Sequence, residues 1–118
     1  MTKTYEGFLV MKDYGESDDV LFLSSFDDPL AEDLSWMCNK RVTVRYWVSE
    51  KEAPREKIKE DFVKQLCGMA DVVFCAHYSE FTGYLWTDED LNIGGHDLLD
   101  ELKSHVGKWL LLEVEAEP

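Results

Sequence analysis

The sequence predicts a single α+β domain, residues 1–118, in which a curled, mostly antiparallel sheet of about five strands carries two or three short helices. Apolar runs of strand length follow one another through turn-like segments or single helices, as is typical of this class. The length suits one hydrophobic core, and no repeat or linker divides the chain. Gly83, inside a long β-rich stretch, predicts a bend, so partial closure into an OB-like barrel is the specific architecture considered.

The N-terminal part is predicted to form a hairpin followed by a short helix. Tyr5–Lys12 and Val20–Ser25 are the two apolar strands, and the polar segment between them predicts a loop longer than two residues. Asp28 and Pro29 then indicate a helix start, with Asp28 as the N-cap. Pro29 suits the first helical position because its missing amide costs no hydrogen bond there.

The middle of the chain is predicted to hold a strand, the longest helix and a second strand. Arg41–Ser49 alternates apolar residues with more polar ones, which indicates a strand with one buried face. Pro54 begins a segment with apolar residues at helical spacing, so a helix is predicted to about Cys67, before a glycine that ends it. Val72–Tyr78 predicts a well-covered strand that continues past the bend at Gly83.

The C-terminal part is organised by a glycine corner. Gly94 and Gly95 favour a sharp turn with positive φ, and Asp97 suits the N-cap of a helix that begins at Leu98. Gly107 should end this helix, and Trp109–Glu115 is predicted to be a strand whose first half is covered on both faces. The apolar stripe of the helix is predicted to consist of Leu98, Leu99, Leu102 and Val106.

The charge excludes several classes of partner. The 25 acidic and 12 basic residues give a formal net charge of −13, which argues against direct binding to nucleic acid or to anionic membranes. A basic protein partner remains compatible, as does a surface that is simply well solvated. No apolar run approaches membrane-spanning length, no leader pattern is visible, and three cysteines without paired spacing fit a reducing compartment, so a cytoplasmic location is expected.

The cysteines and histidines give no pattern for a metal or a catalytic site. Cys75 and His77 share one face of a predicted strand, but cysteine pairs with zinc-site spacing are missing. Nucleophilic catalysis by Cys75 with His77 lacks a recognisable third, orienting group. The carboxylates are abundant but spread, so no acid and base pair is selected. We therefore predict no catalytic residue, no metal site and no cofactor.

Two local motifs have better structural explanations than ligand-binding ones. Asp88, Asp90 and Asn92 resemble the start of a calcium loop, but isoleucine stands where that loop needs glycine, and leucine stands where it needs a bidentate carboxylate. A hydrated acidic turn is the preferred interpretation. The glycine pair before the helix is an unsuitable phosphate cradle, because Asp97 and the acids that follow it would repel an anion.

The aromatic residues near this acidic segment carry the functional hypothesis. Aromatic anchors beside charged residues are a usual composition of protein interfaces. The predicted partner-binding residues are Trp47, Tyr84, Trp86, Asp88, Glu89 and Asp90. They favour a non-catalytic module that presents an acidic surface to a basic protein, in the manner of a nucleic-acid mimic. The alternatives are a small enzyme or ligand-binding barrel with a pocket near Cys75, His77 and His96, and a structural subunit of a homo-oligomer.

Overall fold

The structure is a computed structural model that describes residues 1–118, the side chain of Asp18 excepted. Seven strands, three short α-helices and one 3-10 helix follow one another along the chain. They are β1 (Thr2–Tyr14), β2 (Ser17–Leu23), α1 (Leu30–Asp33), η1 (Ser35–Met37), β3 (Arg41–Ser49), α2 (Arg55–Ile58), β4 (Lys64–Tyr78), β5 (Leu85–Ile93), β6 (His96–Asp97), α3 (Leu98–Lys103) and β7 (Trp109–Ala116).

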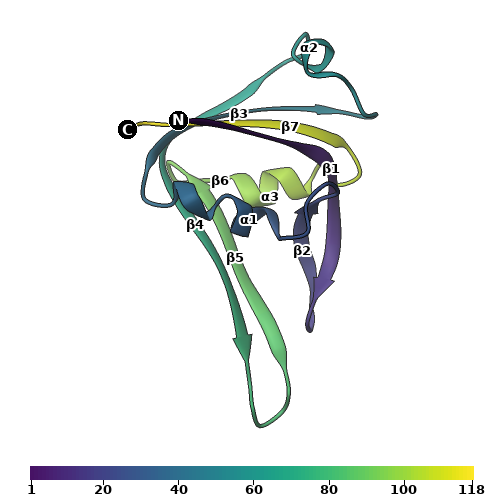
Figure 1. The fold of residues 1–118 in the computed structure, drawn as a ribbon, viewed down its shortest axis with the longest axis vertical. Coiled ribbons are helices and arrows are strands. Elements are labelled where there is room, and N and C mark those ends of the chain that lie inside the picture. Colours follow the sequence, from purple (N-terminus) through teal and green to yellow (C-terminus); the bar gives the residue numbers. More distant parts are fainter.

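All the strands belong to one antiparallel sheet with the order β2-β1-β7-β3-β4-β5-β6. The sheet arches strongly, so the β1–β2 and β4–β5 hairpins descend from the central strands β3 and β7 on either side of α1 and α3 (Figure 1). The α+β class and the antiparallel sheet agree with the prediction. The number of strands is seven instead of about five, and the sheet is not closed, so the partial OB-like barrel is not confirmed.

The arch depends on two long strands that each change partner midway. The first part of β1 pairs with β7 and the second with β2, while the first part of β4 pairs with β3 and the second with β5. Gly68 lies in β4 just before its change of partner, with φ of 144°. A side chain there would collide with the corner after β5, because a Cβ on Gly68 would lie 2.6 Å from the Cα of Gly94.

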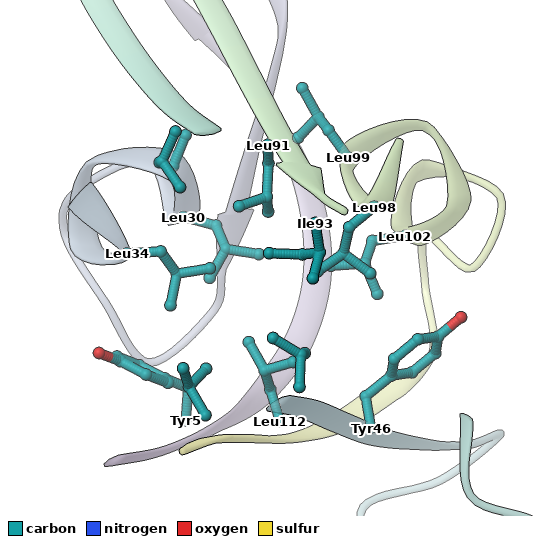
Figure 2. Close-up of a cluster of buried hydrophobic side chains, with 14 of the residues drawn as sticks. Tyr5, Leu30, Leu34, Tyr46, Leu91, Ile93, Leu98, Leu99, Leu102 and Leu112 are labelled. Carbon is teal, nitrogen blue, oxygen red and sulfur yellow. The ribbon is translucent and has the colours of Figure 1, made fainter. Parts of the chain in front are cut away.

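The main core fills the concave side of the arch. Leucines of α1 and α3 point toward inward-facing residues of β5 and of the central strands, with Tyr5 and Tyr46 at its margins (Figure 2). Leu30, Leu34, Leu98, Leu102 and Leu112 are each 0 % exposed. Burial of one such side chain stabilises the fold by about 1.5 to 3 kcal/mol, so short helices that could not persist alone are held by packing.

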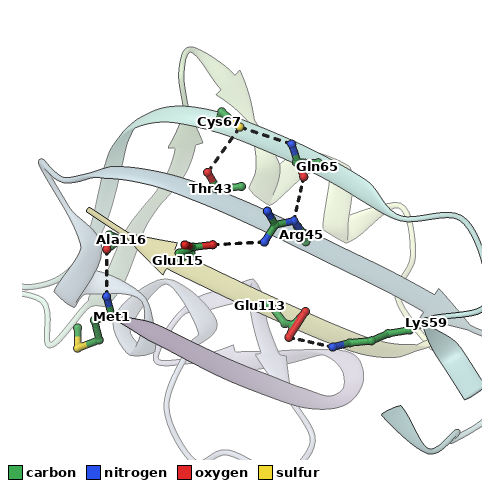
Figure 3. A network of polar contacts seen from close by, with 9 residues as sticks. All are labelled: Met1, Thr43, Arg45, Lys59, Gln65, Cys67, Glu113, Glu115 and Ala116. Atoms are coloured by element: carbon green, nitrogen blue, oxygen red, sulfur yellow. Dashed lines mark hydrogen bonds and ion pairs between the residues drawn. The ribbon is translucent and has the colours of Figure 1, made fainter. Parts of the chain in front are cut away.

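A second, smaller core lies on the convex side. Trp47 and Leu111 point outward from β3 and β7, and Ile58 of α2 covers them. This cover explains why the first half of β7 is apolar on both faces, as predicted. Beyond it the convex face is polar: Arg45 donates to Gln65 at 2.9 Å and approaches Glu115 at 3.5 Å, and Lys59 pairs with Glu113 at 3.1 Å (Figure 3).

The predicted helix from Pro54 to about Cys67 is wrong beyond its first turn. The helix ends at Ile58, and the residues from Lys64 onward are in β4. The apolar residues of the predicted helical face differ in burial: Ile58 is buried on the convex side, whereas Phe62 is fully exposed. Pairing with β3 satisfies the backbone of residues 64–69 along a whole ladder, and such tertiary pairing overrides a helical pattern.

The prediction of an acidic turn at Asp88 to Asp90 is also wrong, and so is the prediction that the preceding strand continues from residue 80 to 86. The chain turns at residues 79–84 instead, where Gly83 has a φ of 69°, and Asp88 and Asp90 lie inside β5. The first hairpin differs similarly, since a two-residue turn at Gly15 and Glu16 replaces the long loop. Glycine at positive φ allows both tight connections.

The glycine corner is confirmed. Gly94 and Gly95 have φ values of 58° and 82°, and the Asp97 carboxylate accepts from the amide of Asp100 at 3.0 Å. The helix α3 ends at Lys103 instead of at the predicted Gly107, so its buried stripe lacks Val106, which is 42 % exposed. At α1 the N-cap is Pro29 instead of Asp28, without a side-chain cap.

The described helices are all short. The longest, α3, has six residues. Across the part of the chain that the structure describes, no helix combines the length and apolar character that a membrane crossing requires.

Candidate interaction surface

The β4–β5 hairpin positions most of the predicted partner-binding residues. It projects from the arch as an arm (Figure 1), and its register fixes which side chains share a face. Asp90 is opposite Val73, Asp88 opposite Cys75, and Trp86 opposite His77. Side chains of directly opposed residues lie on the same side of a sheet, so these three pairs form one face. The core-facing pairs alternate with them, for example Val72 and Leu91.

Three aromatic rings form a row on this face. The rings of His77 and Trp86 are stacked, with centroids 5.2 Å apart and an interplanar angle of 23°. Tyr84 extends the row, with its ring centroid 5.5 Å from that of Trp86, and it is 47 % exposed. Stacked rings hold one another in place, so the row offers a large contact area that loses little conformational freedom on binding.

Carboxylates continue the face beyond the aromatic row. Asp88 and Asp90 are both exposed. The Asp88 carboxylate lies 2.9 Å from His77 Nε2, which is the distance of a hydrogen bond or an ion pair. Lysine and arginine are absent from the six positions that share this face. We call His77, Tyr84, Trp86, Asp88 and Asp90 the hairpin surface.

Two predicted residues do not belong to the hairpin surface. Glu89 alternates with its acidic neighbours and points the other way, where its side chain is only 9 % exposed and pairs with Lys103 of α3 at 3.2 Å. Trp47 lies on the convex side of the arch beneath α2 and is 6 % exposed, with Lys59 Nζ 5.3 Å from its ring centroid. The structure therefore brings together Tyr84, Trp86, Asp88 and Asp90 but separates the other two from them.

His77 was not among the predicted partner-binding residues, although it belongs to this surface. It was assigned only to a possible site with Cys75 or to a pocket with Cys75 and His96. At the end of the hairpin, Phe81 is fully exposed, so further apolar area lies at its turn. Tyr78 is 64 % exposed but is opposite Leu85, so its side chain lies on the other face of the hairpin. Assigning residues 79–84 as a turn, from Thr82-Gly83 flanked by two alternating segments, would have placed His77 beside Trp86 and Phe81 in the turn.

The alternative pocket near Cys75, His77 and His96 is not formed as one cluster. Cys75 and His77 are on the hairpin surface side of β4, whereas His96 pairs with Glu101 of α3. Asp88 does supply the orienting group for His77 that the sequence did not reveal. A hollow with a volume of about 730 Å³ opens elsewhere, beside Phe26, Pro54 and Trp109.

Glu101 is the centre of the strongest local electrostatic cluster. Burial alone would raise its pKa, but hydrogen bonds from Tyr46 and His96, together with the charge of Lys64, lower the pKa below its ordinary value. Desolvation, and then the neighbouring Glu101, raise the pKa of the Tyr46 hydroxyl. Both effects favour a charged Glu101 and a neutral Tyr46. The hydrogen bond between these two side chains attaches α3 to β3 of the sheet.

Among the described side chains, no three histidine, cysteine, aspartate or glutamate residues are grouped as metal ligands. The chain matches no known family model, no curated protein and no solved structure.

Proposed function

We propose that this protein is a non-catalytic binding module that presents the hairpin surface to a basic protein partner. The observation that carries the proposal is the row of His77, Trp86 and Tyr84 on a projecting hairpin, continued by Asp88 and Asp90. Aromatic anchors supply apolar contact and carboxylates supply orientation, and interfaces combine these two elements at their centre and rim.

The net charge supports a basic partner. With a net charge of −13, the whole molecule attracts cationic proteins over distances up to about a Debye length. This attraction increases the rate at which the two proteins meet. The same charge repels nucleic acid and anionic lipid. A basic protein that ordinarily binds nucleic acid would find on the hairpin surface both the carboxylates and the flat rings that imitate phosphates and bases.

The test compares two double variants that remove the same chemistry from different places. Trp86→Ala with Asp90→Asn alters the hairpin surface. Phe62→Ala with Glu60→Gln is the matched control, because both residues are exposed and lie between α2 and β4, outside the paired strands of the β4–β5 hairpin. Each variant loses one aromatic ring and one negative charge.

Immobilised wild type and both variants are incubated with a cell lysate at about 50 mM salt, and the retained proteins are identified. The proposal expects a basic protein to be retained by the wild type and the control but lost by the hairpin variant. Equal retention by all three proteins would refute the hairpin surface as the site. Retention of no basic protein would refute the proposed class of partner.

A further inference from the structure

One margin of the projecting arm is an open sheet edge. Residues 64–69 of β4 pair with β3, but residues 70–78 pair with β5 alone, so this part of β4 lies at the outer margin of the arm (Figure 1). The other margin, formed by β5, is attached to β2, because the Thr87 amide donates to Ser17 Oγ at 2.9 Å. We call residues 72–78 of β4 the open margin.

The backbone groups that face outward along the open margin follow from the alternation of the ladder. In an antiparallel pair, every second residue bonds to its partner, and the residues between them direct their N–H and C=O groups away. The Val72 amide donates to Cys38 Sγ at 3.4 Å, so the even-numbered residues of β4 face away from β5. Phe74, Ala76 and Tyr78 continue this series. Within the part of the chain that the structure describes, their outward backbone groups have no hydrogen-bond partner.

The open margin lacks the features that usually protect an exposed edge. Natural edge strands carry lysine, proline or a bulge that prevents pairing with another chain. The segment 72–78, VVFCAHY, contains no lysine and no proline, and its register with β5 has no bulge. Ala76 and Tyr78 are exposed. An unprotected edge of this kind is suited to pair with an extended peptide.

We propose that the open margin binds an extended segment of the basic partner as an additional strand of the sheet. This inference rests on the proposed function and adds backbone pairing to the contacts of the hairpin surface. Val73 and Cys75, which are short, lie between the open margin and the carboxylates of Asp90 and Asp88. A lysine or arginine of the added strand can therefore reach over β4 to these carboxylates, across two strand spacings or about 10 Å.

The opposite face of the arm selects apolar side chains at the alternate positions of the added strand. Phe74, Ala76 and Tyr78 point to this face. A segment in which basic residues alternate with β-branched or aromatic ones fits both faces. A second copy of this chain fits less well, because residues 70–78 of its β4 offer no lysine or arginine to the hairpin surface. The pairing would also bring together two molecules with a net charge of −13.

The probe is a seven-residue peptide, acetyl-Ser-Lys-Val-Arg-Val-Lys-Ser-amide, titrated into ¹⁵N-labelled protein and followed by NMR. We expect saturable shifts and slower hydrogen exchange at the amides of Phe74, Ala76 and Tyr78, because these amides gain hydrogen bonds to the peptide. The amides of Leu85 and Thr87, on the attached margin, should keep their exchange rates. Unchanged exchange at the three amides of the open margin would overturn the proposal.

Two modified peptides separate strand pairing from attraction by charge. One carries N-methyl groups on both valines and the other on both lysines, and both keep the charge of the probe. Alternate N–H groups of an added strand face β4, whereas the others face solvent. One modified peptide should therefore lose affinity on the order of tenfold, and the other should bind like the unmodified probe. Equal effects of the two modifications would overturn strand pairing.

A proline substitution tests the open margin from the side of the protein. Ala76→Pro removes the central outward N–H, which pairing with β5 does not use, and should weaken probe binding on the order of tenfold. Ala53→Pro, the same substitution in the loop before α2, should leave the affinity unchanged. Unchanged affinity of a folded Ala76→Pro protein would contradict the proposal, and the modified peptides decide if this variant fails to fold.

The remaining outcomes concern the occupant and the proposed function. A dimer of the free protein in which the amides of the open margin are already protected would assign the edge to a second copy and overturn the proposal. Probe pairing along β4, without any basic protein retained from the lysate, would refute the proposed function and keep the strand site. Retention that depends on Trp86 but ignores Ala76→Pro would refute only the strand site.

Discussion

Gly68 and Gly94 lie back to back, so that a side chain on Gly68 would collide with Gly94, and a side chain on Gly94 would collide with the carbonyl oxygen of Cys67. A Cβ on Gly94 would be 2.7 Å from the carbonyl oxygen of Cys67 and 3.5 Å from the Cα of Gly68. The contact joins the bend of β4 to the corner after β5. It therefore sets the angle at which the β4–β5 hairpin, and with it the hairpin surface, leaves the arch.

Gly94→Ala should accordingly destabilise the protein more than Gly95→Ala. Both residues have positive φ, which costs a residue with a Cβ about 1 kcal/mol, but only Gly94 is also blocked by backbone atoms. We expect losses of about 2 to 3 kcal/mol for Gly94→Ala and about 1 for Gly95→Ala, measured by urea unfolding. Equal losses would show that the back-to-back contact is unimportant.

Asp33→Asn should stabilise the protein at pH 7. Burial, and then the neighbouring Asp28 and Glu32, raise the pKa of Asp33 to about 6 from an ordinary value of 3.8. Between these values the unfolded chain releases the proton while the folded chain retains it, so wild-type stability falls as the pH rises through this window. After a discount for solvent screening, the gain from Asn should be about 1 kcal/mol.

The check is urea unfolding of wild type and Asp33→Asn at several pH values. The gain should vanish below about pH 3.5, where both states of the wild type are protonated. Glu32→Gln, on the same helix but exposed, should give a smaller gain. A gain for Asp33→Asn that is independent of pH would contradict the assigned cause.

Glu101→Gln should have the opposite effect. The pKa of Glu101 is lowered in the fold, so its charge contributes stability above the unfolded pKa of about 4.5, and that contribution is lost as the pH falls through the lower folded value. We expect Glu101→Gln to reduce the free energy of unfolding by about 1 to 2 kcal/mol at pH 7, with a difference that shrinks toward pH 3. Thermal unfolding of both proteins over this range measures it, and a constant difference would argue against the charge.

Salt should stabilise the isolated protein and weaken its complex. Raising the salt from about 10 to 200 mM shortens the Debye length from about 30 to about 7 Å, which screens the self-repulsion of a net charge of −13. The attraction for a basic partner is screened over the same range and should appear mainly as a slower association rate. A thermal midpoint that does not rise with salt would contradict the repulsion argument.

The features that could be predicted from the sequence are local ones. The Asp97 cap, the glycine corner and the strand Arg41–Ser49 depend on neighbouring residues, and the structure confirms them. Residues 64–67 could not be assigned correctly, because their strand conformation depends on pairing with β3. A helical pattern carries no information about an available sheet edge.

The residues of the candidate site also divide into those that a local pattern could place and those whose position depends on tertiary contacts. Alternation would place Trp86, Asp88 and Asp90 on one face if the turn were set at residues 79–84, but the predicted acidic turn did not use it. The same alternation would have placed Glu89 on the opposite face, whereas the predicted acidic turn grouped it with Asp88 and Asp90. The burial of Trp47 could not be predicted, because it results from the cover that α2 supplies across the sheet.

The most direct test of the account is hydrogen–deuterium exchange of the protein alone and with the basic partner retained from the lysate. Binding at the hairpin surface should slow exchange in peptides that cover residues 73–92, because the arm loses solvent access and mobility. Residues 55–63, around α2 and Phe62, should exchange as in the free protein. Protection confined to residues 55–63, or an unchanged hairpin in a saturated complex, would contradict the central claim.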